Sequence, residues 1–171
     1  QMEKYGDFRY PFLKIAGLIS SADLAFGNLE GPISERGSDR GSIYSFRARP
    51  EAVEGLKFAG FDVLSLANNH IWDWGSEALL DTIGVLNQNN ISPVGAGKNI
   101  LEANSRAMKE INGTKIAFLA FTNLYPKGLE AGENYPGTSS FDIEKIKEEI
   151  SRLKKSGEAD IVIVSLHWGE E

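Results

Sequence analysis

The sequence predicts an α/β fold in which at least some strands are parallel. Short stretches that are almost continuously apolar alternate with stretches whose apolar residues recur at helical spacing. Nearly uninterrupted runs of Val, Ile, Leu and Phe are typical of strands covered on both faces, as in parallel sheets. The length of 171 residues predicts a single domain that spans residues 1–171. We expect this fold to be incomplete at both ends, because the chain starts at Gln1 and stops directly after a strand-like run.

Four apolar stretches are predicted to be buried strands, at residues 22–27, 61–67, 114–121 and 159–166. The strand at 114–121 also belongs to a predicted antiparallel hairpin with residues 107–111, because Asn112-Gly113 between them is the strongest short turn signal. Residues 125–140 hold several Pro and Gly and are predicted to form a long loop.

Four other stretches are predicted to be helices, at residues 12–20, 50–60, 76–90 and about 141–155. Pro50 suits the first turn of the second helix, and Gly60 suits its end. Ser76 is predicted to cap the third helix. For the fourth helix we predict Asp142 as the N-cap and Gly157 as the stop, with basic residues gathered in the last turns where the helix dipole favours them.

The composition excludes several classes of partner and of site. A formal net charge of −6 and a pI near 5.1, without a basic patch, exclude nucleic acid as a partner. No apolar run approaches the roughly 20 residues of a membrane helix, so we expect this segment to be soluble. Cysteine is absent, and any metal ion must therefore be bound by His, Asn and carboxylate side chains.

Groups that bind metals or transfer protons follow three of the four predicted strands. Ligands of open α/β sheets bind beyond the carboxyl ends of the strands, so neighbouring strand ends would bring these groups together. Imidazole, carboxylate and amide oxygen ligands together suit zinc, manganese or iron. The candidates, which include both histidines of the chain, are Asn28, Glu30, Asn69, His70, His167 and Glu171.

Each candidate also has a purely structural interpretation. A histidine after a strand can be a hydrogen-bonded structural residue, and Glu30 can be a solvated turn residue. Asn68 and Asn69 suit a turn. Arg47 and Arg49 can be surface residues rather than residues that bind an anion. Packing near the strand ends is the expected role of Trp72, Trp74 and Trp168. The shared position at strand ends is what favours a common site.

Several short motifs follow one another along the chain: Asn28-Leu29-Glu30-Gly31, Phe46-Arg47-Ala48, Leu66-Ala67-Asn68-Asn69-His70, Gly95-Ala96-Gly97 and His167-Trp168-Gly169-Glu170-Glu171. Together with Pro50-Glu51, Asp73 and Gly75 between them, these motifs resemble those of the CapA family, capsule-synthesis proteins linked to poly-γ-glutamate. The resemblance extends over nearly the whole chain.

The resemblance implies a calcineurin-like metallophosphoesterase fold, a sandwich of two β-sheets flanked by helices. Proteins of that fold hold two bridged metal ions and use a metal-bound hydroxide as nucleophile. By the same resemblance Glu30, Asn69 and His167 bind metal, with Glu30 in place of a bridging Asp. His70 corresponds to the proton donor or transition-state stabiliser. Asp73 is the second residue assigned to catalysis, as a carboxylate that orients an imidazole.

The remaining candidates support these residues or contact the substrate, namely Asn28, Asn68, Arg47 and Glu171. Two further motifs of the family, a Gly-Asp pair and a Gly-His-His-Pro-His run, fall outside residues 1–171. Two bridged metal ions need roughly eight ligand positions. We therefore expect this segment to bind metal weakly or not at all, and the full-length parent to hold two ions of Mn, Zn or Fe.

Two functions remain open at this point. The first is a metal-dependent hydrolase-like protein of poly-γ-glutamate capsule synthesis, acting on a phosphoester or on an amide bond of the polymer. The second is a non-catalytic assembly or export subunit of a membrane synthase. The resemblance places either at the extracellular face of the cell envelope, with a membrane anchor outside this segment. A dinucleotide site is excluded, because Gly95-Ala96-Gly97 lacks the third glycine at the required spacing.

Overall fold

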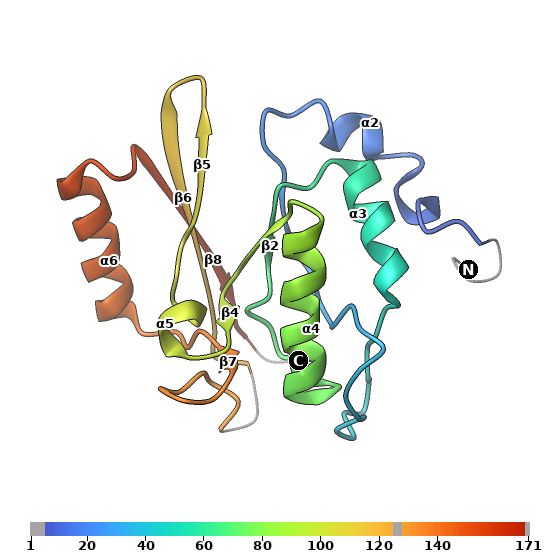
Figure 1. Ribbon diagram of the computed structural model, residues 1–171. Coiled ribbons are helices and arrows are strands. Elements are labelled where there is room, and N and C mark those ends of the chain that lie inside the picture. The colour runs from blue at the N-terminus through green and yellow to red at the C-terminus, as the bar shows by residue number, and fades with distance from the viewer. Residues whose placement is uncertain (1–5, 125–127, 170–171) are drawn as a thin grey trace. The chain divides into compact units, whose positions relative to one another are not determined.

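A computed structural model describes residues 6–124 and 128–169 of the chain (Figure 1). The chain divides into two compact units. The first unit comprises Gln1–Leu64 and His70–Pro93, and the second comprises Ser65–Asn69 and Val94–Glu171. Helices and several sheets occur together, which confirms the predicted α/β class and agrees with the fold that the family resemblance implies. The assignment of residues 1–171 to a single domain stays a prediction.

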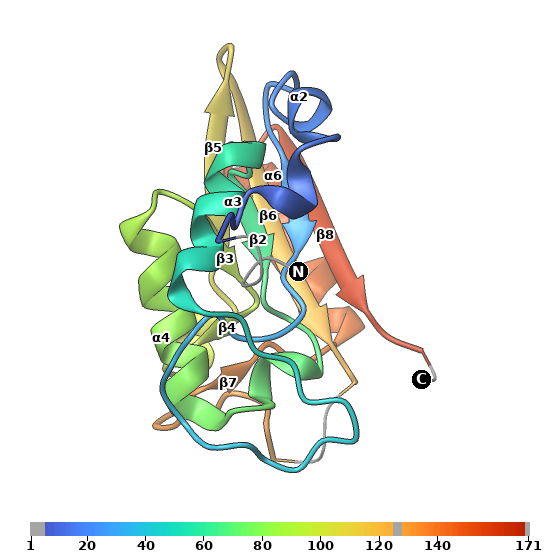
Figure 2. The same cartoon turned by 90° about the vertical axis from the view of Figure 1, so that its right-hand side faces the viewer.

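The first unit contains a three-stranded sheet with the strand order β1-β2-β3. Its helices α2 and α3 are in contact, and Figures 1 and 2 show them side by side. In chain order its elements are η1 (Tyr10–Phe12), α2 (Ala16–Ile19), β1 (Phe26–Asn28), η2 (Pro50–Ala52), α3 (Val53–Ala59), β2 (Val63–Ser65), η3 (His70–Trp72), α4 (Gly75–Gln88) and β3 (Ser92–Val94).

Two predicted elements of the first unit are shorter than expected. The helix predicted at residues 12–20 is reduced to two short helical turns, because Ala16 is the buried residue of α2 and Leu18 is 77% exposed. A helix this short needs a packed apolar face, which it lacks. The strand predicted at residues 22–27 begins only at Phe26. Before it, the Ala25 amide donates to the Asp62 carboxylate at 2.8 Å rather than to a strand neighbour.

The two longer helices of the first unit occur where the sequence predicts them. The helix predicted at residues 50–60 starts as η2, continues as α3 and ends at Gly60, whose φ of 88° is left-handed. Ser76 does not cap α4 as predicted. The helix begins at Gly75, with φ of 78°, where a Cβ atom would lie 2.7 Å from the Arg40 side chain. The backbone must turn there, and Ser76 falls inside the first turn.

The second unit is built on a three-stranded sheet with the order β5-β6-β8. In chain order its elements are β4 (Ala96–Gly97), α5 (Ile100–Ala103), β5 (Ala107–Ile111), β6 (Thr114–Thr122), β7 (Gly137–Thr138), α6 (Ile143–Ser156) and β8 (Ile161–His167). Figure 2 shows β5 running against β6, and β6 and β8 running in the same direction. The predicted hairpin and the predicted parallel pairing are therefore both confirmed.

Local signals of the second unit are mostly confirmed. Asn112 and Gly113 both adopt positive φ, at 51° and 80°, which is the hairpin turn that this dipeptide favours. Asp142 caps α6 by accepting from the amides of Glu144 and Lys145. The loop predicted at 125–140 is only partly a loop, because β7 lies within it and pairs with β4 in an antiparallel two-stranded sheet.

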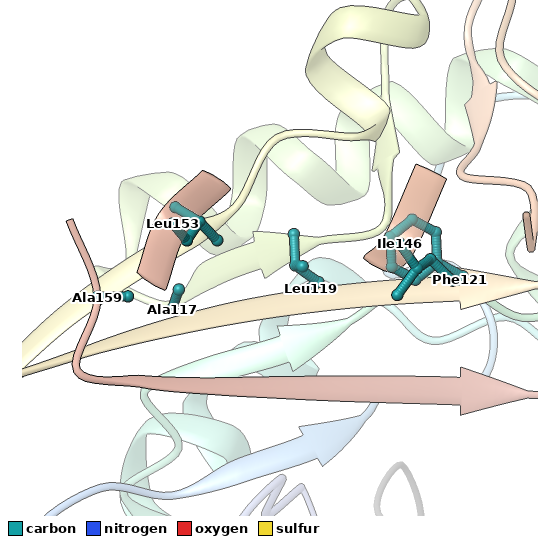
Figure 3. Close-up of a cluster of buried hydrophobic side chains, with 6 residues drawn as sticks. All are labelled: Ala117, Leu119, Phe121, Ile146, Leu153 and Ala159. Carbon is teal, nitrogen blue, oxygen red and sulfur yellow. The ribbon is translucent and has the colours of Figure 1, made fainter. Parts of the chain in front are cut away.

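The core of the second unit lies between β6 and α6. Alternate residues of β6 face the helix, and two apolar residues of α6, one near each end, complete the cluster together with Ala159 after the helix (Figure 3). Its members are Ala117, Leu119, Phe121, Ile146, Leu153 and Ala159, and Val162, Val164 and Leu166 of β8 pack against it. A one-residue slip of β6 would exchange these side chains for those of the opposite face, such as Phe118 and Ala120, which differ in size. Packing against α6 therefore favours the observed register.

None of the helices in the described part of the chain combines the length and the apolar character that crossing a membrane requires.

Candidate functional site

His167 and Asn69 form a close polar pair in the second unit. His167 is the last residue of β8 and lies opposite Thr122 in the parallel register, and its carbonyl accepts from the Thr122 hydroxyl at 2.8 Å. Its Nε2 atom lies 3.0 Å from the Asn69 Oδ1 atom, and both residues are half-buried. The sheet therefore holds an imidazole nitrogen beside an amide oxygen.

The 3.0 Å separation permits two kinds of interaction. Without a metal, the Nε2 hydrogen is donated to the amide oxygen. Two ligand atoms bound to one ion at about 2.1 Å lie about 3.0 to 3.5 Å apart. The same pair can therefore serve as two ligands of one ion with little movement of the backbone. Asn68, which precedes this pair, is fully buried at 0% exposure, and that burial favours a supporting role over contact with a substrate.

In the first unit, Asp73 is a buried carboxylate that organises a loop. Its exposure is 2%, and its Oδ1 atom accepts from the Ser42 hydroxyl at 2.7 Å. Its Oδ2 atom accepts from the Phe46 amide at 2.7 Å and lies 2.8 Å from Nδ1 of His70. Since a carboxylate can only accept, Nδ1 of His70 carries a hydrogen in this contact. Asp73 thereby orients the His70 ring, which is the kind of contact that the family resemblance implies for this carboxylate.

Two further contacts define the surroundings of His70. The Phe46 ring lies against the imidazole, with centroids 4.2 Å apart and an interplanar angle of 36°. On the far side of the ring, Nε2 lies 4.0 Å from a carboxylate oxygen of Glu30. Asn28 donates to the other oxygen of Glu30 at 3.1 Å. The structure therefore brings Asn28, Glu30, His70 and Asp73 together within the first unit.

A pocket of about 310 Å³ adjoins Glu30 in the same unit. Its lining combines one acidic and one basic side chain with apolar and backbone surface. The lining residues are Leu29, Glu30, Gly31, Pro32, Ser45, Phe46, Arg47 and Ala48. The guanidinium of Arg47 lies over the Trp74 ring, 3.6 Å from its centroid. Trp72 and Trp74 are half-buried, in line with the predicted packing role, whereas Trp168 is 65% exposed and does not pack as predicted.

The metal-site prediction rests on residues from both units. Within residues 6–124 and 128–169, no group of three or more His, Cys, Asp or Glu side chains is arranged to hold a metal ion. The Asn69–His167 pair supplies two ligand atoms. That Glu30 joins them in one site stays a prediction, and Glu171 lies outside the described residues.

Sequence reasoning missed the contribution of the loop before α3. Ser42 was not singled out, and Phe46 was noted as part of a motif without a role. Both bind the Asp73 carboxylate, and Phe46 also contacts His70. A serine in an irregular segment gives no periodic signal, and its partner lies 31 positions away in the sequence. The Phe46-Arg47-Ala48 motif was the signal that could have directed attention to this loop.

Comparison with known proteins identifies the family of this chain. A family model described as "Bacterial capsule synthesis protein PGA_cap" matches residues 1–171. The chain belongs to this family. The capsule biosynthesis protein CapA of Bacillus anthracis is 34% identical, and the match covers 99% of this chain and 43% of the relative. These findings confirm the CapA resemblance that the motifs indicate.

Two other family relatives show how the chain relates to longer proteins. The PGA biosynthesis protein CapA of Bacillus subtilis (strain 168) is 34% identical over 94% of this chain and 42% of the relative. A probable polyglutamine synthesis accessory protein of Mycobacterium tuberculosis is 29% identical over 95% of this chain and 46% of the relative. The chain thus spans less than half the length of the curated relatives it matches.

Proposed function

We propose that this chain is part of a poly-γ-glutamate capsule-synthesis protein and carries residues of a metal-dependent, hydrolase-like site. The family match and the printed names of the relatives support the role in capsule synthesis. The observation that carries the proposed chemistry is the 3.0 Å approach of His167 Nε2 to Asn69 Oδ1 at the carboxyl end of β8. Imidazole and amide oxygen side by side form a ligand pair for a borderline divalent ion.

In this proposal Asn69, His167 and Glu30 hold the metal, and its class is Mn, Zn or Fe. When bound, a divalent metal supplies Lewis acidity at the reacting bond. The further ligands that a two-metal centre needs would come from chain beyond residues 1–171. The substrate is a phosphoester or an amide bond of the polymer, and the protein acts at the cell envelope together with subunits of the polymer synthase.

His70 acts on a proton in this proposal. Its Nδ1 hydrogen is donated to Asp73, so the second proton of the imidazolium form is carried on Nε2 and would pass from there to the leaving group, which leaves a neutral ring. The Phe46 ring restricts rotation of the imidazole, and Asp73 fixes its tautomer. Asn28 holds the Glu30 carboxylate by a hydrogen bond and so limits its rotamers. These contacts position both groups before a substrate arrives.

The test is a metal titration combined with an activity assay. Mn²⁺ and Zn²⁺ are titrated into residues 1–171 and into the complete gene product, and bound metal is counted by plasma mass spectrometry. We expect Asn69→Ala and His167→Ala to weaken metal binding about tenfold or more. Asn123→Ala is the matched control, because Asn123 is an exposed asparagine just after β6. His70→Asn should keep the metal and lose hydrolysis of a chromogenic phosphodiester or of poly-γ-glutamate.

A complete gene product that stays free of metal after Mn²⁺ and Zn²⁺ loading would overturn this proposal. The non-catalytic assembly or export subunit would then be the better description of the protein. Equal metal loss in Asn123→Ala and in His167→Ala would also count against the assigned ligands.

A further inference from the structure

The pocket beside Glu30 has the features of a subsite for a carboxylate. At about 310 Å³ it is large enough for a small acyl or amino-acid unit. Arg47 supplies the positive charge of its lining, and no carboxylate of the described residues forms an ion pair with this guanidinium. On a chain with a net charge of −6, a basic group at a pocket that no described carboxylate neutralises is available to an external anion.

The stacking of Arg47 prepares its guanidinium for binding. The flat face of the group lies over the Trp74 ring at 3.6 Å, which restricts its motion, and its N–H groups have no side-chain partner among the residues that the structure describes. A guanidinium held in this way offers two parallel N–H groups, which match the two oxygens of a carboxylate. A lysine at this position would provide the positive charge without the two parallel N–H groups.

Gly31 and Phe46 pack closely in the lining of the pocket, and this contact helps to hold the loop that carries Arg47. Gly31 adopts a φ of 114°, and a Cβ atom there would lie 2.9 Å from Cβ of Phe46. Gly31 therefore allows Phe46 to approach closely, while the Phe46 amide is held by Asp73. Arg47 follows directly, so its backbone is fixed from one side by the same contacts that position His70.

The charged residues of the pocket favour an anion with a single negative charge. Glu30 lines the same pocket and contributes a negative charge close to any ligand that Arg47 binds. A phosphate monoester carries nearly two charges at neutral pH, and in the metal-free chain Glu30 would repel it while one guanidinium balances only one of its charges. A carboxylate carries one charge, which Arg47 alone balances.

We propose that Arg47 binds a carboxylate of a γ-glutamyl unit in this pocket and thereby directs the site to the polymer rather than to a phosphate monoester. This inference rests on the proposed function, because Glu30 belongs both to the pocket and to the proposed metal ligands. A carboxylate held by Arg47 brings the neighbouring amide bond of the polymer toward Glu30. Arg47 is thus a specificity-determining residue of the same site.

The binding test uses residues 1–171 in chelator-containing buffer, so that it does not depend on a metal. A γ-linked tetraglutamate is titrated by calorimetry and by Trp fluorescence, which reports on Trp74 beneath the guanidinium. Inorganic phosphate, phenyl phosphate and the same tetramer with its carboxylates amidated are the comparison ligands. We expect the tetraglutamate to bind most tightly and the amidated tetramer to bind at least tenfold more weakly.

Three variants test the role of Arg47. Arg47→Gln should weaken tetraglutamate binding about tenfold or more. Arg47→Lys should give an intermediate loss, because lysine keeps the charge but lacks the two parallel N–H groups. Arg36→Gln is the matched control, since Arg36 is an exposed arginine of the same unit outside the pocket lining. It removes one positive charge and should leave the affinity unchanged. Circular dichroism of each variant checks that the fold is retained.

The inference is overturned if the wild-type chain does not bind tetraglutamate, if it prefers phosphate, or if Arg47→Gln and Arg36→Gln bind alike. These outcomes differ from failure of the proposed function. Carboxylate binding that depends on Arg47, in a protein that never binds metal, would retain the subsite and remove the hydrolase-like chemistry. Metal binding lost in His167→Ala, with no effect of Arg47→Gln on polymer binding, would do the reverse.

Discussion

The two units position their polar residues by different physical means. In the second unit, His167 is placed by the register of two parallel strands, and the apolar face of the same sheet is buried against α6. In the first unit, His70 and the loop around Phe46 are placed by one buried carboxylate, Asp73, which collects hydrogen bonds from irregular backbone. A strand distributes the energy of positioning over many contacts, whereas the loop depends on a few.

The two units should therefore lose stability through different kinds of substitution. Loss of one contact in the sheet leaves the register in place, because the remaining ladder bonds and the core still define it. Loss of Asp73 leaves several donors unpaired at once. The first unit should therefore be the more sensitive of the two to a single polar substitution, and the second unit to a cavity in its core.

The largest effect is expected for Asp73→Ala. The substitution leaves the Ser42 hydroxyl, the Phe46 amide and Nδ1 of His70 without their buried acceptor. We expect the free energy of unfolding to fall by about 4 kcal/mol, measured by urea denaturation. Hydrogen exchange should accelerate at the Phe46 amide and not in β6. Unchanged exchange at Phe46 would contradict the organising role of Asp73.

A smaller loss is expected for Leu153→Ala in the core of the second unit. Leu153 is completely buried between α6 and β6, and its removal opens a cavity in the cluster of Figure 3. The expected loss is about 3 kcal/mol in the free energy of unfolding. Hydrogen exchange should rise across β6 and β8 together, because the whole sheet depends on this face. Exchange that rises only in α6 would argue against the sheet acting as one element.

Thr122→Val tests how much one hydrogen bond contributes to the placement of His167. The variant keeps the shape of the side chain and removes the hydroxyl that donates to the His167 carbonyl and accepts from the Leu124 amide. We expect a loss of about 1 kcal/mol, because the β6–β8 register persists. Nuclear magnetic resonance of the His167 ring should show only a small change. A displaced ring would show that register alone does not hold it.

The smallest expected effect is a pH dependence of the free energy of unfolding that arises from charged side chains on and just after α6. Hydrogen bonds from Arg152 lower the pKa of Glu149 and of Glu158 below the usual 4.5. Since the folded-state pKa is the lower one, the stabilisation is complete above the unfolded-state pKa. It is lost as the pH falls through about 4.5 and below. Urea denaturation between pH 3 and 6 should show a decline that is shallower in Arg152→Gln. An identical decline in that variant would contradict the assignment.

Much of the second unit could be predicted from the sequence. The β6 and β8 strands, the Asn112-Gly113 turn and the capped α6 helix follow from local patterns, because each depends on the residues within it. The family motifs indicated Asn69 and His167 as candidate metal ligands, and the structure places these two side chains next to each other. The exact bounds and the short β7 strand could not be predicted, because a two-residue strand exists only where a neighbour pairs with it.

The sequence by itself determined the α/β class, the family and the residue types available for chemistry, since periodicity and motifs are properties of the chain. Only the tertiary structure decided which groups meet: Asp73 with Ser42 and Phe46, and Arg47 with Trp74. These contacts join irregular segments far apart in the sequence, where neither helical nor strand spacing relates one residue to another. Hydrogen bonding to a buried carboxylate and stacking of a cation on an aromatic ring depend on proximity, and folding alone creates it.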